Sequence, residues 1–194
     1  MTAEPAQEGV DPGVPGTTQD VAWRRWGGGH GVPLVVLHGV TDDSGCWTPL
    51  AAGWSRGRTV IGVDARGHGA TPLGDEGFTI AALARDVAAV VRAELAAGPA
   101  VVLGHSMGAL VAQELALAEP DLVNSLVLED PAWRRDRGAT GSGCPEHVAE
   151  FVRANASRTL GDLIDLAPAW PPGEVEPWAL AKQRVDPRLL EVTL

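Results

Sequence analysis

The chain has 194 residues, 45% of them hydrophobic, which suits one globular domain with a substantial core and argues against a disordered chain. Its formal net charge of −10 excludes nucleic acid and anionic membranes as expected partners, because both attract basic protein surfaces. The two cysteines, Cys46 and Cys144, form no C-x-x-C pair, and the chain begins without a basic and apolar leader, so we expect a cytoplasmic protein without disulfides.

The first elements in chain order are a tail and a set of apolar runs. Residues 1–19 are acidic and rich in proline and glycine, and we expect them to form a flexible tail before a core of residues 20–131. Residues 21–26 alternate in polarity, which is typical of an antiparallel edge strand. Unbroken Val, Leu and Ile content predicts buried parallel strands at 33–37, 59–63, 100–103 and 125–128.

Helical patterns separate these runs. Apolar residues recur at helical spacing over 79–95, with Thr79 placed to cap the helix, and a second helix is expected over 107–117. This order predicts an α/β fold with a doubly wound, mostly parallel sheet. Residues 132–194 contain no further strand-like run and are expected to form a helical lid, with short helices at 143–155, 158–166 and 175–184.

A Gly-x-Ser-x-Gly motif directly follows the apolar run 100–103 and directly precedes the second helix. It reads Gly104-His105-Ser106-Met107-Gly108. In a strand-to-helix turn of this kind, the serine hydroxyl projects from the sheet, and the flanking glycines are required because side chains there would clash with the neighbouring strand and helix. The motif therefore predicts that Ser106 is a nucleophile.

Two glycine-containing turns follow neighbouring strands. His38-Gly39-Val40 ends the run 33–37, and a turn at that position offers a backbone N–H to an oxyanion. Val40 N–H and Met107 N–H are the candidates for an oxyanion hole. The segment from Asp64 to Thr71 follows the run 59–63, and we expect it to be structural, with Asp64 tied to Arg66.

With these three motifs in this order, the sequence resembles the α/β-hydrolase superfamily, particularly its capped bacterial esterase-like and haloperoxidase-like members. The resemblance covers residues 20–131 and implies that Ser106 is the nucleophile and that Val40 and Met107 supply the oxyanion hole. It also implies a triad in the chain order serine, acid, histidine. Serine at the turn disfavours the related epoxide hydrolases and haloalkane dehalogenases, which carry aspartate there.

The sequence does not clearly supply the acid and the base of that triad. After Ser106 the sequence contains a single histidine, His147, which sits at the start of the predicted lid helix 143–155 and is expected to face solvent. Asp130, after the run 125–128, is the candidate acid. We therefore expect the chain to be a fragment of the fold that lacks the last strands of the sheet, with the run 125–128 left as an exposed edge through which copies self-associate.

The function expected is a serine hydrolase that acts on a carboxylic ester or related small acyl substrate through an acyl-enzyme. A C–C bond hydrolase or perhydrolase of the same fold is the alternative within the family. A non-catalytic or half-domain binding protein is the alternative outside catalysis. No metal or cofactor is expected, because no ligand cluster or phosphate-binding loop occurs. Trp133, Trp170 and Trp178 are expected to fill the core of the lid, and lining an apolar pocket is their alternative role.

Overall fold

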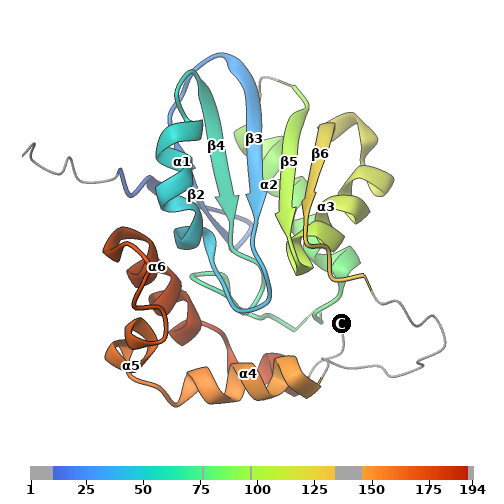
Figure 1. Cartoon of the computed structure of the whole chain (residues 1–194). Coiled ribbons are helices and arrows are strands. Elements are labelled where there is room, and N and C mark those ends of the chain that lie inside the picture. The colour runs from blue at the N-terminus through green and yellow to red at the C-terminus, as the bar shows by residue number, and fades with distance from the viewer. Residues whose placement is uncertain (1–10, 76, 97, 134–145, 192–194) are drawn as a thin grey trace, which may run out of the picture.

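A six-stranded sheet in the order β1-β2-β4-β3-β5-β6 forms the centre of the computed structural model (Figure 1), which describes residues 11–75, 77–96, 98–133 and 146–191. The strands are β1 Val14–Thr18, β2 Val21–Trp26, β3 Gly31–Leu37, β4 Arg58–Val63, β5 Ala100–His105 and β6 Val123–Glu129. The last four of these pair in parallel, whereas β1 and β2 are antiparallel. The predicted mostly parallel sheet is confirmed.

Helices cover both faces of this sheet, as its unbroken apolar strands require. The 3-10 helix η1 (Ser44–Trp47) and helix α1 (Thr48–Trp54) lie on one face, and α2 (Ile80–Glu94) and α3 (Met107–Ala118) lie on the other. A short 3-10 turn, η2 (Pro120–Leu122), leads into β6. Thr79 caps α2 as predicted, because its hydroxyl oxygen accepts the Ala82 N–H at 3.1 Å. The central strand residues Val35, Ile61 and Val102 are fully buried.

The expected flexible tail over residues 1–19 is wrong for strand β1, while residues 1–10 lie outside the described part. Gln19 and Asp20 both have positive φ and form the two-residue turn between Thr18 and Val21, which pair across the hairpin. Pro15 is tolerated because β1 is an edge strand. The proline and glycine content of this segment predicts a loose tail, but pairing with β2 stabilises it as a strand.

Helices form a cap over the carboxyl ends of the parallel strands (Figure 1), in agreement with the predicted helical lid. They are α4 Glu146–Ala156, α5 Leu160–Asp165, α6 Pro172–Gln183 and the 3-10 helix η3 Pro187–Glu191. Thr159 and Asp162 form a reciprocal capping box at the start of α5. The Asp186 N–H donates to the Gly67 carbonyl oxygen at 2.8 Å, which attaches the cap to the loop after β4.

Strand β6 is the final strand of the sheet in the described part of the chain. Leu126 and Val127 are 36% and 47% exposed, so the apolar edge expected from the sequence is present. Self-association through this edge stays a prediction. None of the helices among the described residues is long and apolar enough to cross a membrane.

Candidate active site

Ser106 lies between the last residue of β5 and the first residue of α3, with φ 52° and ψ −112°. Positive φ is rare for a residue with a side chain, and this turn directs the chain sharply from strand into helix. The glycines around it are required by contact: a Cβ at Gly104 would lie 2.2 Å from the Gly108 carbonyl oxygen. Ser106 thus lies on the sharp strand-to-helix turn that the motif predicted, and this turn from Gly104 to Gly108 is called the elbow below. The role of Ser106 as a nucleophile stays a prediction.

This backbone strain leads to a stability prediction. Replacing Ser106 with glycine is expected to raise the free energy of unfolding by about 1 kcal/mol, because a strained φ/ψ costs about 1–3 kcal/mol and glycine removes most of that cost. Replacing it with alanine keeps the Cβ and the strain, so we expect a change within about 0.5 kcal/mol. Urea unfolding of both variants measures the difference. An S106G protein less stable than S106A would show that the elbow is unstrained.

The turn after β3 packs against the elbow. A Cβ at Gly39 would lie 3.1 Å from Nδ1 of His105, so the two turns are in close approach. The Asp42 N–H donates to the Gly39 carbonyl oxygen at 3.1 Å and closes the turn. His38 Nε2 accepts the Ala65 N–H at 3.0 Å, and its Nδ1 lies 2.7 Å from the Gly39 oxygen. These contacts fix the turn that carries the Val40 N–H.

His68 is fully buried beneath the same turn. Its Nε2 lies 2.6 Å from the Val40 carbonyl oxygen and its Nδ1 2.8 Å from that of Arg66. Burial, followed by the nearby His38, lowers the pKa of His68 from 6.5 to about 4. The neutral ring donates to only one of these two carbonyls, so the contacts oppose the effect of burial, which is the larger of the two. A buried histidine placed between two loops supports the structural role that the sequence suggested for this segment.

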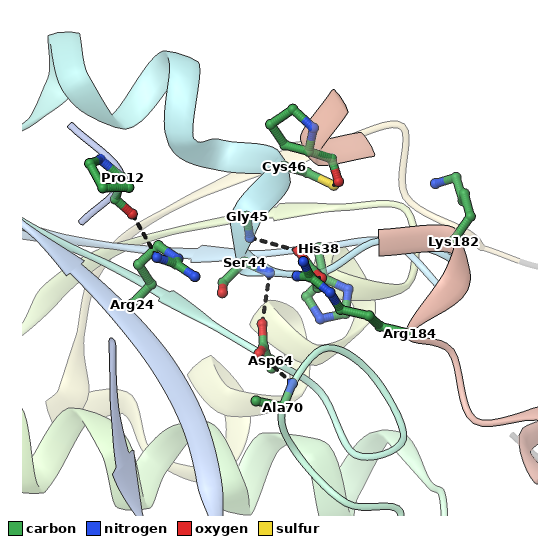
Figure 2. A network of polar contacts seen from close by, with 12 residues as sticks. Pro12, Arg24, His38, Ser44, Gly45, Cys46, Asp64, Ala70, Lys182 and Arg184 are labelled. Atoms are coloured by element: carbon green, nitrogen blue, oxygen red, sulfur yellow. Dashed lines mark hydrogen bonds and ion pairs between the residues drawn. The ribbon is translucent and has the colours of Figure 1, made fainter. Parts of the chain in front are cut away.

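Asp64 joins the loops that follow β3 and β4. Its carboxylate accepts the Ser44 N–H at 2.7 Å and the Ala70 N–H at 3.0 Å, contacts that Figure 2 shows as dashed lines. The sequence predicted a tie between Asp64 and Arg66. Arg66 instead makes an ion pair with Asp86 of α2, at 2.6 Å and 2.9 Å. Each group thus has a partner on another element, which sequence spacing did not indicate.

The candidate acid, Asp130, follows β6 beside the elbow and has φ 41°. Backbone hydrogen bonds from its neighbours hold the elbow. The Ser106 N–H donates to the Glu129 carbonyl oxygen at 2.9 Å, and the Ala132 N–H donates to the Ser106 carbonyl oxygen at 3.3 Å. Within the described part of the chain, neither the Ser106 hydroxyl nor the Asp130 carboxylate makes a hydrogen bond. His147 belongs to α4, but its side chain lies outside the described residues.

The cap supplies two cations to the site that the sequence pattern did not indicate. Lys182 forms an ion pair with Asp42, and Arg184 forms one with Asp43 at 2.9 Å. Figure 2 shows Arg184 reaching from the cap toward the segment that carries Gly45. Burial, followed by the charge of Asp64, raises the pKa of Asp43 above its ordinary value. The one available signal was that Lys182 is the only lysine in the sequence.

A cavity of about 240 Å³ lies between the cap and the segment after β3. Its lining comprises Asp42, Cys46, Pro49, Leu50, Trp170, Glu174 and Trp178. Trp170 and Trp178 make an edge-to-face contact at 5.6 Å, so the alternative role for these residues, lining a pocket, fits them better than filling the cap core. Trp133 instead donates to Gln113 of α3 at 3.0 Å. No cluster of three or more metal-ligating side chains occurs among the described residues.

Comparisons with known proteins show which family the sequence resembles. A family model described as alpha/beta hydrolase fold matches residues 32–189. The chain is 38% identical over 102 residues to 2-(acetamidomethylene)succinate hydrolase of Mesorhizobium japonicum, covering 53% of this chain and 36% of the relative. It is 34% identical over 175 residues to Lipase LipV of Mycobacterium tuberculosis, covering 90% of this chain and 60% of the relative. The chain thus spans about a third to three-fifths of the length of these relatives.

A solved structure extends the likeness to the fold. The thermophilic esterase from Thermogutta terrifontis superposes with a TM-score of 0.65 at 23% identity, covering 91% of this chain and 68% of that chain. At this identity the match concerns architecture alone. It supports the α/β architecture of sheet and helices described above.

Proposed function

The chain belongs to the alpha/beta hydrolase family, and on that premise we propose that it carries the nucleophile and the oxyanion hole of a serine hydrolase acting on carboxylic esters or related acyl compounds. The observation that carries the proposal is the positive φ of Ser106 at the junction of β5 and α3. The turn bearing Val40 packs against this junction. The names of the two relatives, a hydrolase and a lipase, support the reaction class.

In the proposed reaction, Ser106 Oγ attacks the acyl carbonyl carbon and a new C–O bond forms. The carbonyl oxygen becomes an oxyanion, and the N–H groups of Val40 and Met107 stabilise it. The positive end of the α3 dipole points to the same place. The bond between the carbonyl carbon and the alkoxy oxygen then breaks, the alcohol leaves with the proton that the Ser106 hydroxyl lost, and an acyl-enzyme remains. Water attacks the acyl-enzyme, which releases the carboxylic acid and restores the Ser106 hydroxyl. We propose the carboxylate of Asp130 as the acid of the triad and the cytoplasm as the location.

The base is the part of this mechanism that the described residues do not supply. A serine hydroxyl is a weak nucleophile at neutral pH until a base takes its proton. Because the Ser106 hydroxyl has no hydrogen-bond partner in the described part of the chain, we expect Ser106 to react slowly. The same observation favours the second candidate function, a hydrolase-like protein that binds acyl compounds without turnover.

Added imidazole separates these two functions. Imidazole can act as the missing base in solution, so we expect it to accelerate the labelling of Ser106 by a fluorophosphonate about tenfold or more. Intact-mass measurement of the adduct gives the rate, and Ser106→Ala is the control that should not be labelled. A wild-type chain that stays unlabelled at all imidazole concentrations, or that is labelled as fast as S106A, would reject the catalytic proposal in favour of the binding protein.

A further inference from the structure

Lys182 is buried at the interface of the cap and the core, where a charged side chain is unfavourable unless it has partners. Its side chain is 2% exposed, and lysine is almost never buried unless it is paired. Its Nζ donates to the Thr41 carbonyl oxygen at 3.0 Å and to the carboxylate of Asp42. The ring of Trp178 covers a further side of the ammonium, with Nζ 4.8 Å from the ring centroid.

Both oxygen partners of Lys182 follow directly after Val40, the candidate oxyanion donor. The same turn is fixed from the core side by the contact of His68 with the Val40 oxygen at 2.6 Å. It is closed by the hydrogen bond from Asp42 to Gly39 at 3.1 Å. Lys182 adds the contact from the cap side, at the Thr41 carbonyl oxygen and the Asp42 carboxylate. Displacing the ammonium would leave the Asp42 carboxylate unpaired and the Thr41 carbonyl without this donor.

We propose that Lys182 is a positioning residue for the oxyanion hole, holding the turn that presents the Val40 N–H and thereby making that donor's placement depend on the seating of the cap. The inference rests on the proposed function, because it assigns a catalytic purpose to the turn. Arg184, two residues after Lys182, holds the same segment by pairing with Asp43. The Asp43 carboxylate also accepts the Gly45 N–H at 2.8 Å. The pairing of Lys182 and Asp42 joins residues 140 positions apart in the sequence.

A purely structural role for Lys182 makes a different prediction. An ion pair that only attaches the cap would change stability when it is lost, but it would leave the chemistry at Ser106 unaltered. A positioning role requires that the reaction itself slows, because displacing a catalytic group by about 1 Å can cost on the order of 100-fold in rate. The two roles are separated by comparing the saturating rate of Ser106 labelling with the probe concentration that gives half of that rate.

The test uses the whole chain with Lys182→Met, and it uses Arg188→Met as the matched control. Arg188 belongs to the same cap and carries the same charge, but it pairs with Asp186 and is largely exposed. Lys182→Arg is the conservative variant, and Asp42→Asn weakens the same pair from the core side. Each folded variant is labelled with the fluorophosphonate in imidazole, and amide hydrogen exchange is measured over residues 39–47.

For K182M we expect the saturating labelling rate to fall by about 10- to 100-fold, with the half-saturating probe concentration changed by less than about threefold. Exchange over residues 39–47 should rise by about tenfold or more. D42N should shift both readouts in the same direction, K182R should recover most of the rate, and R188M should match the wild type. Unchanged exchange in K182M, or raised exchange with an unchanged labelling rate, would overturn the proposal.

The exchange measurement keeps this inference separate from the proposed function. If the wild-type chain is labelled and K182M is labelled equally fast, the positioning role fails while the serine hydrolase assignment stands. If the wild-type chain is never labelled, the serine hydrolase assignment fails and the catalytic purpose of the turn fails with it. Exchange over residues 39–47 then still decides whether Lys182 fixes the turn.

Discussion

Replacing Gly108 with alanine is expected to lower the free energy of unfolding by about 3 kcal/mol or more, although alanine is the better helix former. A Cβ at this position would lie 2.3 Å from the Leu37 carbonyl oxygen and 2.8 Å from that of His38. Both atoms are backbone at the end of β3 and cannot rotate away. Helix α3 would have to move off the sheet, and Ser106 would move with it. Urea unfolding measures the loss.

Gly53 provides the matched control, because it is also a helical glycine but a Cβ there would meet no atom of the described residues within 4 Å. Replacing it with alanine in α1 is expected to raise the free energy of unfolding by about 0.5–1 kcal/mol. The same substitution should therefore have opposite signs at the two positions. A G108A protein as stable as the wild type would contradict the close packing of α3 against β3 on which the elbow depends.

Removing His68 is expected to flatten the acid side of the stability profile. Burial lowers the pKa of this base from 6.5 to about 4, so the folded state holds the ring neutral where the unfolded chain binds a proton. Its contribution to stability is complete above pH 6.5 and is lost as the pH falls toward 4. The difference in pKa corresponds to about 3 kcal/mol.

Urea unfolding between pH 4.5 and 7.5 should show this loss in the wild type and a shallower slope in His68→Gln, whatever the stability of that variant at pH 7. His30→Gln, at an exposed position, controls for the removal of one histidine. Asp43 acts in the opposite direction, because its raised pKa favours folding as the pH falls, but it is present in every variant and cancels from the comparison. An unchanged slope in H68Q would contradict the description of His68 as a buried neutral base.

Much of the sheet was predictable from the sequence, because strands buried on both faces must be apolar without interruption. The runs around Val35, Ile61 and Val102 therefore appear as buried parallel strands. The run around Leu126 also pairs in parallel, but the prediction that it is buried is wrong, because most of β6 is exposed at the end of the sheet. Strand β1 was missed for the opposite reason. Its proline and glycine weaken local β preference, and only pairing with β2 and the turn at Gln19 and Asp20 makes it a strand.

The sequence by itself also determined the position of the elbow. A Gly-x-Ser-x-Gly motif between an apolar strand and a helix has one sterically suitable backbone, and Ser106 adopts it with positive φ. This inference needed only neighbours in the chain. Gly104 belongs to the same local argument, because a Cβ there would meet the backbone of Gly108 and Ala109, whereas a Cβ at Gly108 would meet Leu37 and His38 at the end of β3, which is a tertiary contact.

Only the tertiary structure decided which polar groups meet around that elbow. Asp64 bonds to the backbone of Ser44 and Ala70 instead of to Arg66, and Lys182 of the cap reaches the turn beside Val40. The physical reason is that a charged side chain pairs with whatever group folding places within about 3 Å of it. Sequence periodicity reports which residues are buried, but it carries no information about which loops and caps converge at one end of a sheet.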